Sequence, residues 1–321
     1  MDIKDILFSA SSLKTYKQCG RKFYFYRIEK REPTHEPYHY GWVGTIVHNC
    51  VYYSIADYND EEWKVSGIKP LTKVNKFFDD LWDGTIELDV SKQLVEDEEI
   101  KPNKPIFKPD SMKEKKYLGL SSDVETQWRL LAKDLLFNGY RLIVDLLKES
   151  DELLLEKEIR FKYNDVIDVV GYVDILVKPE NGKWRFYDLK TSRQAPRSVD
   201  NDLQFYFYKY GIKKLFDLDY EPDGHFVHLR TGKLVKSSKV KKEIVEGTEK
   251  EILELLDGIS NGSFLPNLYS PLCAFCDFRG YCYGDDGSAI IGKYDDKVSL
   301  VKGIDESKTK GNFSLFVYTG G

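Results

Sequence analysis

Two aspartates and a lysine between residues 174 and 190 have the types and spacing to hold a cation. The sequence contains Gly171-x-x-Asp174 followed by Asp188-x-Lys190. Two neighbouring carboxylates resist joint ionisation unless a cation lies between them, and such hard oxygen ligands suit Mg²⁺ or Mn²⁺. A cation bound there polarises a phosphoryl oxygen and lowers the pKa of a bound water. The ammonium of Lys190 can steer that water or stabilise negative charge.

Whether the two carboxylates meet depends on the hairpin that carries them. Strand-like patterns predict three consecutive strands, at residues 154–163, 166–178 and 183–190. A three-residue loop at 180–182, with Gly182 in the left-handed position, places Asp174 directly across from Asp188, with Lys190 on the same face. A two-residue turn would put the aspartates on opposite faces, and the stretch would then be an ordinary hairpin.

Other polar residues lie on predicted elements elsewhere in the chain. His48 lies on a helix predicted at 44–53, where by itself it is read as a satisfied histidine at the edge of the core. Gln204 and Tyr208 lie four residues apart on a predicted helix, so they share one face. Glu158, on the first strand, is a further carboxylate for which a surface position is favoured.

Three of the five cysteines have metal-ligand spacing in the segment Cys273-x-x-Cys276-x5-Cys282. A closed site needs a fourth ligand, and four thiolates suit either a [4Fe–4S] cluster or Zn²⁺. The spacing alone leaves both open. Cys50 lies on the apolar side of its helix and is predicted to pack in the core.

The elements that must position these residues indicate an α/β protein. Helical periodicity is predicted from residue 11 to 23 and at 44–53, 125–148, 202–215 and 242–256, and a strand pair at 225–235. Residues of about 60–123 have little periodicity and many charges, which indicates an insertion with some helix, and residues 286–321 form a polar tail. The sequence contains no internal repeat and no phosphate-binding loop of the G-x-x-x-x-G-K-[ST] type.

The charge of the chain is modest and unevenly spread. A net charge of −5 argues against indiscriminate nucleic-acid binding, yet residues 230–242 hold six basic residues and no acid. This segment is either a basic track or an ordinary solvated face. The sequence has no apolar run that could span a bilayer and no signal-peptide pattern at residues 1–10, so a cytoplasmic location and no membrane partner are expected.

Taken in order, these motifs resemble the PD-(D/E)XK nuclease superfamily, and within it the RecB/AddB-type and CRISPR-associated iron–sulfur nucleases. The residues that carry the resemblance are Ser9-x-Ser11-x-x-Lys14-x-Tyr16-x-x-Cys19 with the aromatic run 23–26, Gly44-x-x-x-His48, Gly171-x-x-Asp174, Asp188-x-Lys190, Gln204-x-x-x-Tyr208 and the three later cysteines. The chain departs from the family in having Gly20 where proline is frequent and aspartate at 188 where glutamate is common.

The resemblance implies a restriction-endonuclease-like mixed β-sheet flanked by helices, with a helical N-terminal part. It implies a single nuclease domain over residues 1–285, a catalytic core at 151–215 and a cluster-binding segment at 264–285. The implied metal ligands are His48, Asp174, Asp188 and the backbone carbonyl of Leu189, with Lys190, Gln204 and Tyr208 in the active site. It also implies that Cys19 completes the ligand set of Cys273, Cys276 and Cys282, and it favours [4Fe–4S] over zinc.

The resulting hypothesis is a metal-dependent DNA nuclease of repair or recombination, acting as an exonuclease on single-stranded or end-containing DNA. The residues expected to contact phosphate are Arg21, Lys22, Arg193 and Arg197. A helicase, recombinase or replication protein is the expected kind of partner. The alternatives are a catalytically idle nuclease fold that binds DNA or assists assembly, and a zinc-stapled interaction protein.

Overall fold

The structure is a computed structural model that describes residues 3–34, 39–59, 62–83, 89–91, 104–106, 122–180, 182–237, 242–267, 272–273 and 276–282. The chain divides into two compact units. Unit 1 consists of Met1–Asp5, Ser11–Pro37 and Glu251–Gly321, and unit 2 of Ile6–Ala10 and Tyr38–Lys250. The predicted tail at 286–321 and most of the loop part of the predicted insertion lie outside the described residues.

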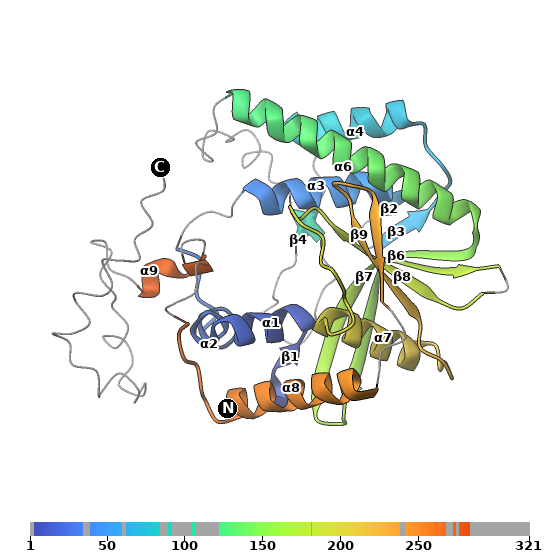
Figure 1. Ribbon diagram of the computed structural model, residues 1–321. Coiled ribbons are helices and arrows are strands. Elements are labelled where there is room, and N and C mark those ends of the chain that lie inside the picture. The colour runs from blue at the N-terminus through green and yellow to red at the C-terminus, as the bar shows by residue number, and fades with distance from the viewer. Residues whose placement is uncertain are drawn as a thin grey trace. The chain divides into compact units, whose positions relative to one another are not determined.

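Unit 2 is built on a six-stranded mixed sheet (Figure 1). Its strands are β1 (Leu7–Phe8), β6 (Ser150–Tyr163), β7 (Ile167–Pro179), β8 (Arg185–Lys190), β9 (Asp223–His228) and β10 (Lys233–Lys236). The order is β1-β7-β8-β9-β10, and β6 also pairs with β7. β7 is antiparallel to β6 and β8, whereas β1 and β7, and β8 and β9, are parallel. The predicted mixed α/β sheet is therefore confirmed.

Helices cover both faces of this sheet (Figure 1). α3 (His39–Tyr53), α4 (Leu71–Asp83) and α6 (Ser122–Lys148) share a core with alternate residues of the strands, among them Ile175 and Leu189. α7 (Leu203–Leu215) packs on the opposite face, where Phe186 contacts Phe205 and Tyr208 at ring distances of 5.1 and 5.6 Å. Strand alternation sends neighbouring residues of β8 into different layers.

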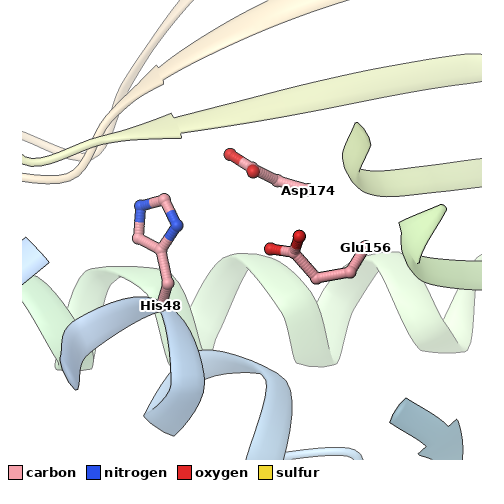
Figure 2. Close-up of side chains that lie close together, drawn as sticks. All are labelled: His48, Glu156 and Asp174. Carbon is pink, nitrogen blue, oxygen red and sulfur yellow. The ribbon is translucent and has the colours of Figure 1, made fainter. Parts of the chain in front are cut away.

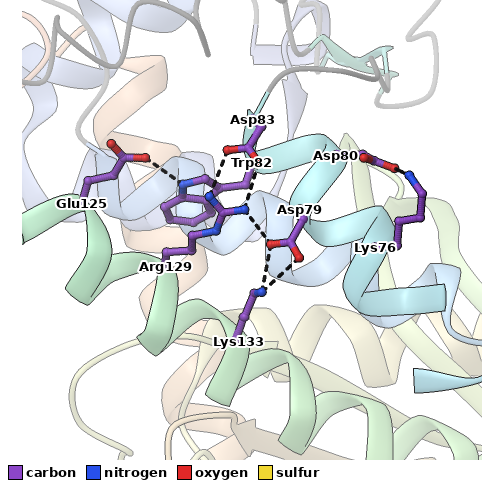
Figure 3. Close-up of polar contacts among 8 residues, drawn as sticks. All are labelled: Lys76, Asp79, Asp80, Trp82, Asp83, Glu125, Arg129 and Lys133. Carbon is purple, nitrogen blue, oxygen red and sulfur yellow. Dashed lines mark hydrogen bonds and ion pairs between the residues drawn. The ribbon is translucent and has the colours of Figure 1, made fainter. Parts of the chain in front are cut away.

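Charged side chains tie α4 to α6 (Figure 3). Arg129 of α6 pairs with Asp79 at 2.6 Å and with Asp83 at 2.9 Å, and Lys133, one turn later, also pairs with Asp79 at 2.9 Å. Below these ion pairs, Phe78 is fully buried. α4 falls within the predicted insertion, and its burial makes this part of the insertion a component of the core of unit 2.

The smaller elements complete the two units. Two short hairpins are formed by β2 (Ala56–Asn59) with β3 (Glu62–Val65) and by β4 (Asp89–Ser91) with β5 (Lys104–Ile106). α8 (Lys242–Ser260) begins in unit 2 and ends in unit 1. Among the described residues, no helix combines the length and apolar character needed to cross a bilayer.

Unit 1 joins the beginning of the chain to its later part. It contains η1 (Ile3–Asp5), most of α1 (Ala10–Gln18), α2 (Gly20–Phe23), η2 (Tyr24–Ile28), the end of α8 and α9 (Arg279–Cys282). The Tyr16 hydroxyl donates to the Ser263 carbonyl at 2.6 Å, and Phe264 stacks on Phe23 at 6.2 Å. The single helix predicted from residue 11 to 23 is wrong, because Cys19 has an extended backbone and caps α2.

Candidate active site and cysteine cluster

The hairpin of β7 and β8 has the predicted register. Its paired residues are Ile175 with Tyr187, Leu176 with Phe186 and Val177 with Arg185. Continued by one residue, this register sets Asp174 across from Asp188, and the Leu189 N–H donates to Asp174 Oδ2 at 2.6 Å. The expected left-handed conformation of Gly182 is wrong, since its φ lies outside that region, although its N–H closes a turn to the Pro179 carbonyl at 2.8 Å.

His48, Glu156 and Asp174 form a compact group of candidate metal ligands (Figure 2). They come from α3, β6 and β7, and one ligand atom from each lies within 4.8 Å of the other two. Among the described residues, this is the one group of three or more histidine, cysteine or carboxylate ligands that meets this distance. The predicted pair His48 and Asp174 therefore converges, and Glu156 joins it.

Glu156 was missed by the sequence reasoning. It has a left-handed backbone, with φ of 47°, although it lies inside strand β6. Tyr52 of α3 donates its hydroxyl to Glu156 Oε1 at 2.7 Å. Burial raises the pKa of Tyr52, and the carboxylates of Asp174 and Glu156 raise it further, so the hydroxyl stays protonated and remains a donor. Glu158, the carboxylate considered from the sequence, instead accepts from the Tyr172 hydroxyl at 3.0 Å.

Asp188 lies outside this group of three, although it was expected as a ligand. Its Oδ1 accepts from Lys190 Nζ at 2.7 Å and from Gln204 Nε2 at 3.0 Å. Burial raises its pKa to about 6 against the opposing effect of Lys190, and the neighbouring Asp174 carboxylate adds to the increase. Burial would lower the pKa of Lys190, but Asp188 and Asp174 outweigh it and raise that pKa. Lys190 is therefore held as a cation beside two carboxyl groups.

α7 supplies the polar residues that support Asp188 from the other side. Gln204 Nε2 also donates to the Tyr208 hydroxyl at 2.8 Å, and that hydroxyl donates in turn to the Tyr172 carbonyl. The helix begins after Asp202, whose carboxylate accepts from the Gln204 N–H at 2.7 Å as an N-cap. The predicted pair Gln204 and Tyr208 thus shares a face directed at Asp188, within a continuous hydrogen-bonded chain.

The loop that follows Lys190 is tied to the turn after β9. The His228 ring, through Nε2, donates to the Ser192 carbonyl at 2.9 Å, and Arg230 Nε donates to the Thr191 carbonyl at 3.0 Å. Arg193 and Arg197, further along this loop, are exposed. These two of the four residues expected to contact phosphate are therefore accessible, on a segment anchored next to the site.

The four cysteines of the predicted cluster lie together within unit 1. Cys19, Cys273, Cys276 and Cys282 line one pocket. Burial raises the pKa of Cys282 to about 12, and Cys19 and Cys276 add to this, so the thiolate is disfavoured unless a cation is present. No three of these sulfurs, all of them described, approach one another within 4.8 Å.

The two basic residues after Cys19 are placed differently from the expectation that they contact phosphate. Arg21 is 5% exposed, and its guanidinium lies 5.8 and 5.7 Å from the ring centroids of Tyr24 and Phe25. Its burial makes it unsuited to contact phosphate at the surface. Lys22 is partly exposed and pairs with Asp277 at 2.9 Å.

The comparison with protein families covers both the site and the cysteines. The family model described as the PD-(D/E)XK nuclease superfamily matches residues 7–283. This range contains every strand of the six-stranded sheet, the polar residues around Asp174 and all four clustered cysteines. No curated protein matches the chain.

Proposed function

Because the chain belongs to the PD-(D/E)XK nuclease superfamily, we propose that it is a metal-dependent deoxyribonuclease whose cation is held by His48, Glu156 and Asp174. The observation that carries this proposal is the convergence of one imidazole and two carboxylates, from three separate elements, within 4.8 Å. These donors fit a hard divalent cation, and the imidazole favours Mn²⁺ without excluding Mg²⁺. Asp188 and the Leu189 carbonyl remain predicted ligands on β8.

The side chains around the group have separate parts in hydrolysis. The cation, when bound, supplies Lewis acidity toward a phosphoryl oxygen and an activated water. Lys190, whose side chain is 36% exposed, presents an ammonium to the negative charge that develops on the phosphate. Asp188 anchors that ammonium at 2.7 Å, and Gln204 holds Asp188 in place. Arg193 and Arg197 are accessible to contact the DNA backbone.

We further propose that the enzyme degrades DNA from an end. The support is the order of its motifs, which resembles that of the RecB/AddB-type and CRISPR-associated nucleases. A partner that opens or delivers a DNA end, such as a helicase or recombinase, suits this activity. An exonuclease of this kind belongs to DNA repair or recombination.

The test is digestion of linear single-stranded, linear double-stranded and covalently closed circular DNA with Mn²⁺ or Mg²⁺. We expect the linear substrates to be shortened, and Asp174→Ala and Lys190→Ala to lose cleavage while still binding DNA. Asp168→Ala and Lys162→Ala are matched controls, because this exposed ion pair lies on β7 and β6 of the same sheet. Equal cleavage by both site variants would refute the assignment.

Two further outcomes separate the rival functions. Wild-type protein that binds DNA but cleaves no substrate with either cation would support a catalytically idle DNA-binding or assembly module. Cleavage of closed circles at the rate of linear DNA would show endonuclease action and contradict the proposal that the enzyme needs an end.

We propose that Cys19, Cys273, Cys276 and Cys282 hold a [4Fe–4S] cluster that stabilises unit 1. The four residues line a common pocket, and the resemblance to the iron–sulfur nucleases favours a cluster over a single zinc ion. Because Cys19 is distant in sequence from the other three, the cluster would close a very long loop. A structural role follows from that position.

The cluster is tested by iron, sulfide and zinc analysis of protein purified without oxygen. We expect a brown protein that absorbs near ~400 nm, and loss of that absorption in Cys282→Ser. Cys50→Ala is the control, because Cys50 is fully buried in unit 2 and lies outside the set. A colourless protein with one equivalent of zinc would support the zinc alternative instead.

A further inference from the structure

Glu156 departs from the backbone of the strand that carries it. The pairing of β6 with β7 has the same register on both sides, with Leu155 opposite Ile175 and Lys157 opposite Val173, so no residue is inserted at Glu156. Yet Glu156 has a φ of 47°. Of the non-glycine residues with positive φ in the described part of the chain, it is the one in a strand. Such a conformation persists only where the surroundings hold it.

One turn of α3 provides both an expected ligand and the contact that holds Glu156. Tyr52 follows His48 by four residues, so the two side chains share a face of the helix. The Tyr52 hydroxyl donates to Glu156 Oε1 at 2.7 Å. Its ring lies 6.1 Å from the His48 ring and 5.8 Å from that of Trp63, both in edge-to-face arrangements. At 1% exposed, the Tyr52 side chain has little freedom to turn away.

Asp174 is the neighbour of Glu156 on the adjacent strand. The common register places the two residues across from each other on β6 and β7, and their carboxylates both lie in the group with His48. Two carboxylates brought this close repel each other when no cation separates them. A donor that is hydrogen-bonded to one of them therefore opposes its movement toward solvent. Tyr52 is placed to do this.

We propose that Tyr52 is a positioning residue that holds Glu156 as the third protein ligand of the cation, so that a single turn of α3 sets two of the three ligands. This inference rests on the proposed metal-dependent function and adds to it the means by which the ligand set is fixed. The hydroxyl binds Oε1 and thereby restrains the carboxylate in its place beside His48 and Asp174. The left-handed backbone at Glu156 and the burial of the Tyr52 ring both support the hydrogen bond between the Tyr52 hydroxyl and the Glu156 carboxylate.

The experiment measures Mn²⁺ binding directly, in the absence of DNA, from the electron paramagnetic resonance signal of free Mn²⁺. Groups that orient a metal ligand change affinity by about 10- to 100-fold when they are removed. We expect Tyr52→Phe to raise the Kd for Mn²⁺ by about 10-fold. We expect kcat at saturating Mn²⁺ to remain near that of wild type. Tyr140→Phe is the control, since its hydroxyl makes one hydrogen bond to the Lys69 carbonyl at 3.0 Å within the same helical layer.

A second variant tests the pair rather than the tyrosine alone. Glu156→Gln keeps an oxygen acceptor for the hydroxyl but removes the charge, and we expect it to weaken Mn²⁺ binding more than Tyr52→Phe does. Adding Tyr52→Phe to Glu156→Gln should then produce little further loss, because the hydroxyl acts through the carboxylate. Independent, additive losses would contradict the proposed coupling. Should Tyr52→Phe fail to fold, an unchanged Kd in Glu156→Gln would overturn the inference by itself.

The possible outcomes distinguish a failure of the proposed role of Tyr52 from a failure of the proposed metal-dependent function. Wild-type protein that binds no Mn²⁺ would overturn both the cation site and the role of Tyr52. Wild-type protein that binds Mn²⁺ and cleaves DNA, with a Kd unchanged in Tyr52→Phe, would overturn only the positioning role. A variant that melts at a lower temperature but keeps the wild-type Kd would show that the hydroxyl serves the fold alone.

Discussion

The buried carboxyl of Asp188 makes the stability of the cation-free protein depend on pH. Asp188 is 1% exposed, and its pKa is raised from the ordinary 3.8 to about 6, chiefly because burial disfavours the charged form. A folded-state pKa above the unfolded value means that the native protein binds the proton more tightly. The resulting stabilisation is fully present below about pH 4 and is lost as the pH rises through about 6.

The size of this effect follows from the shift. At 1.36 kcal/mol for each unit, a shift of about two units corresponds to roughly 3 kcal/mol in the free energy of unfolding. Asp188→Asn removes the titrating group and leaves an oxygen that can still accept from Gln204. Lys190 loses its partner, but its side chain is 36% exposed and its ammonium can turn to water. The ion pair forms only when Asp188 is ionised, and its contribution is already contained in the pKa of about 6, because Lys190 opposes the effect of burial.

The assay is urea denaturation of wild type and Asp188→Asn at several pH values from 4 to 8, with a chelator present. We expect the free energy of unfolding of the variant, relative to wild type, to increase by about 2–3 kcal/mol between pH 4 and pH 8. Asp168→Asn, an exposed position on β7, should show no such trend. A difference between Asp188→Asn and wild type that stays constant across the range would refute the reasoning.

Three further substitutions test other parts of the structure. Cys276→Ser should strip the cluster and lower the melting temperature, and an equally stable brown variant would contradict a structural role. Arg129→Met should lower the free energy of unfolding by about 1 kcal/mol, because two half-exposed ion pairs to α4 are lost together. Urea denaturation should show a smaller decrease at high salt than at low salt, because salt screens these pairs. Gly211→Ala would bring a Cβ within 2.7 Å of Phe161 and 2.8 Å of Ile159. We therefore expect the free energy of unfolding to decrease by about 1–3 kcal/mol in the same assay. An unchanged denaturation midpoint would disprove this.

Regular elements with strong periodicity were predictable from the sequence. The helix predicted at 125–148 is α6, and the helix predicted from Asp202 is α7, with Asp202 as its cap. The strands at 154–163 and 166–178 are found with shifts of a few residues at their ends. In these segments, local propensity and burial pattern agree, so the residues themselves specify the element.

Short elements depend on their partners and were missed. β1 consists of Leu7 and Phe8 alone, and it becomes a strand through parallel pairing with Asp168 and Val169 of β7. β3 was assigned to the beginning of an insertion, and its partner β2 was not predicted. Strands of two to four residues have too few positions for an alternating pattern, so tertiary pairing decides them.

The candidate metal ligands show, at the level of single residues, the same limit of prediction from sequence. The register of Asp174 and Asp188 followed from the length of one loop, which is a local property. Glu156 carried no comparable signal, because Glu152, Glu156 and Glu158 are separated by even numbers of residues and strand alternation places them all on one face. What distinguishes Glu156 is a left-handed backbone and a hydroxyl from α3, and neither is encoded near it in the sequence.

By itself, the sequence determined the α/β class and the succession of motifs from His48 to Cys282, and it reduced the facing of the two aspartates to the length of one loop. These are properties of residue type, spacing and period, which act over a few neighbouring residues. Only the tertiary structure decided that Glu156 rather than Asp188 completes a group with His48, and that Arg21 is buried. Such choices depend on packing between segments far apart in the chain, where burial and repulsion between charges select which side chains meet.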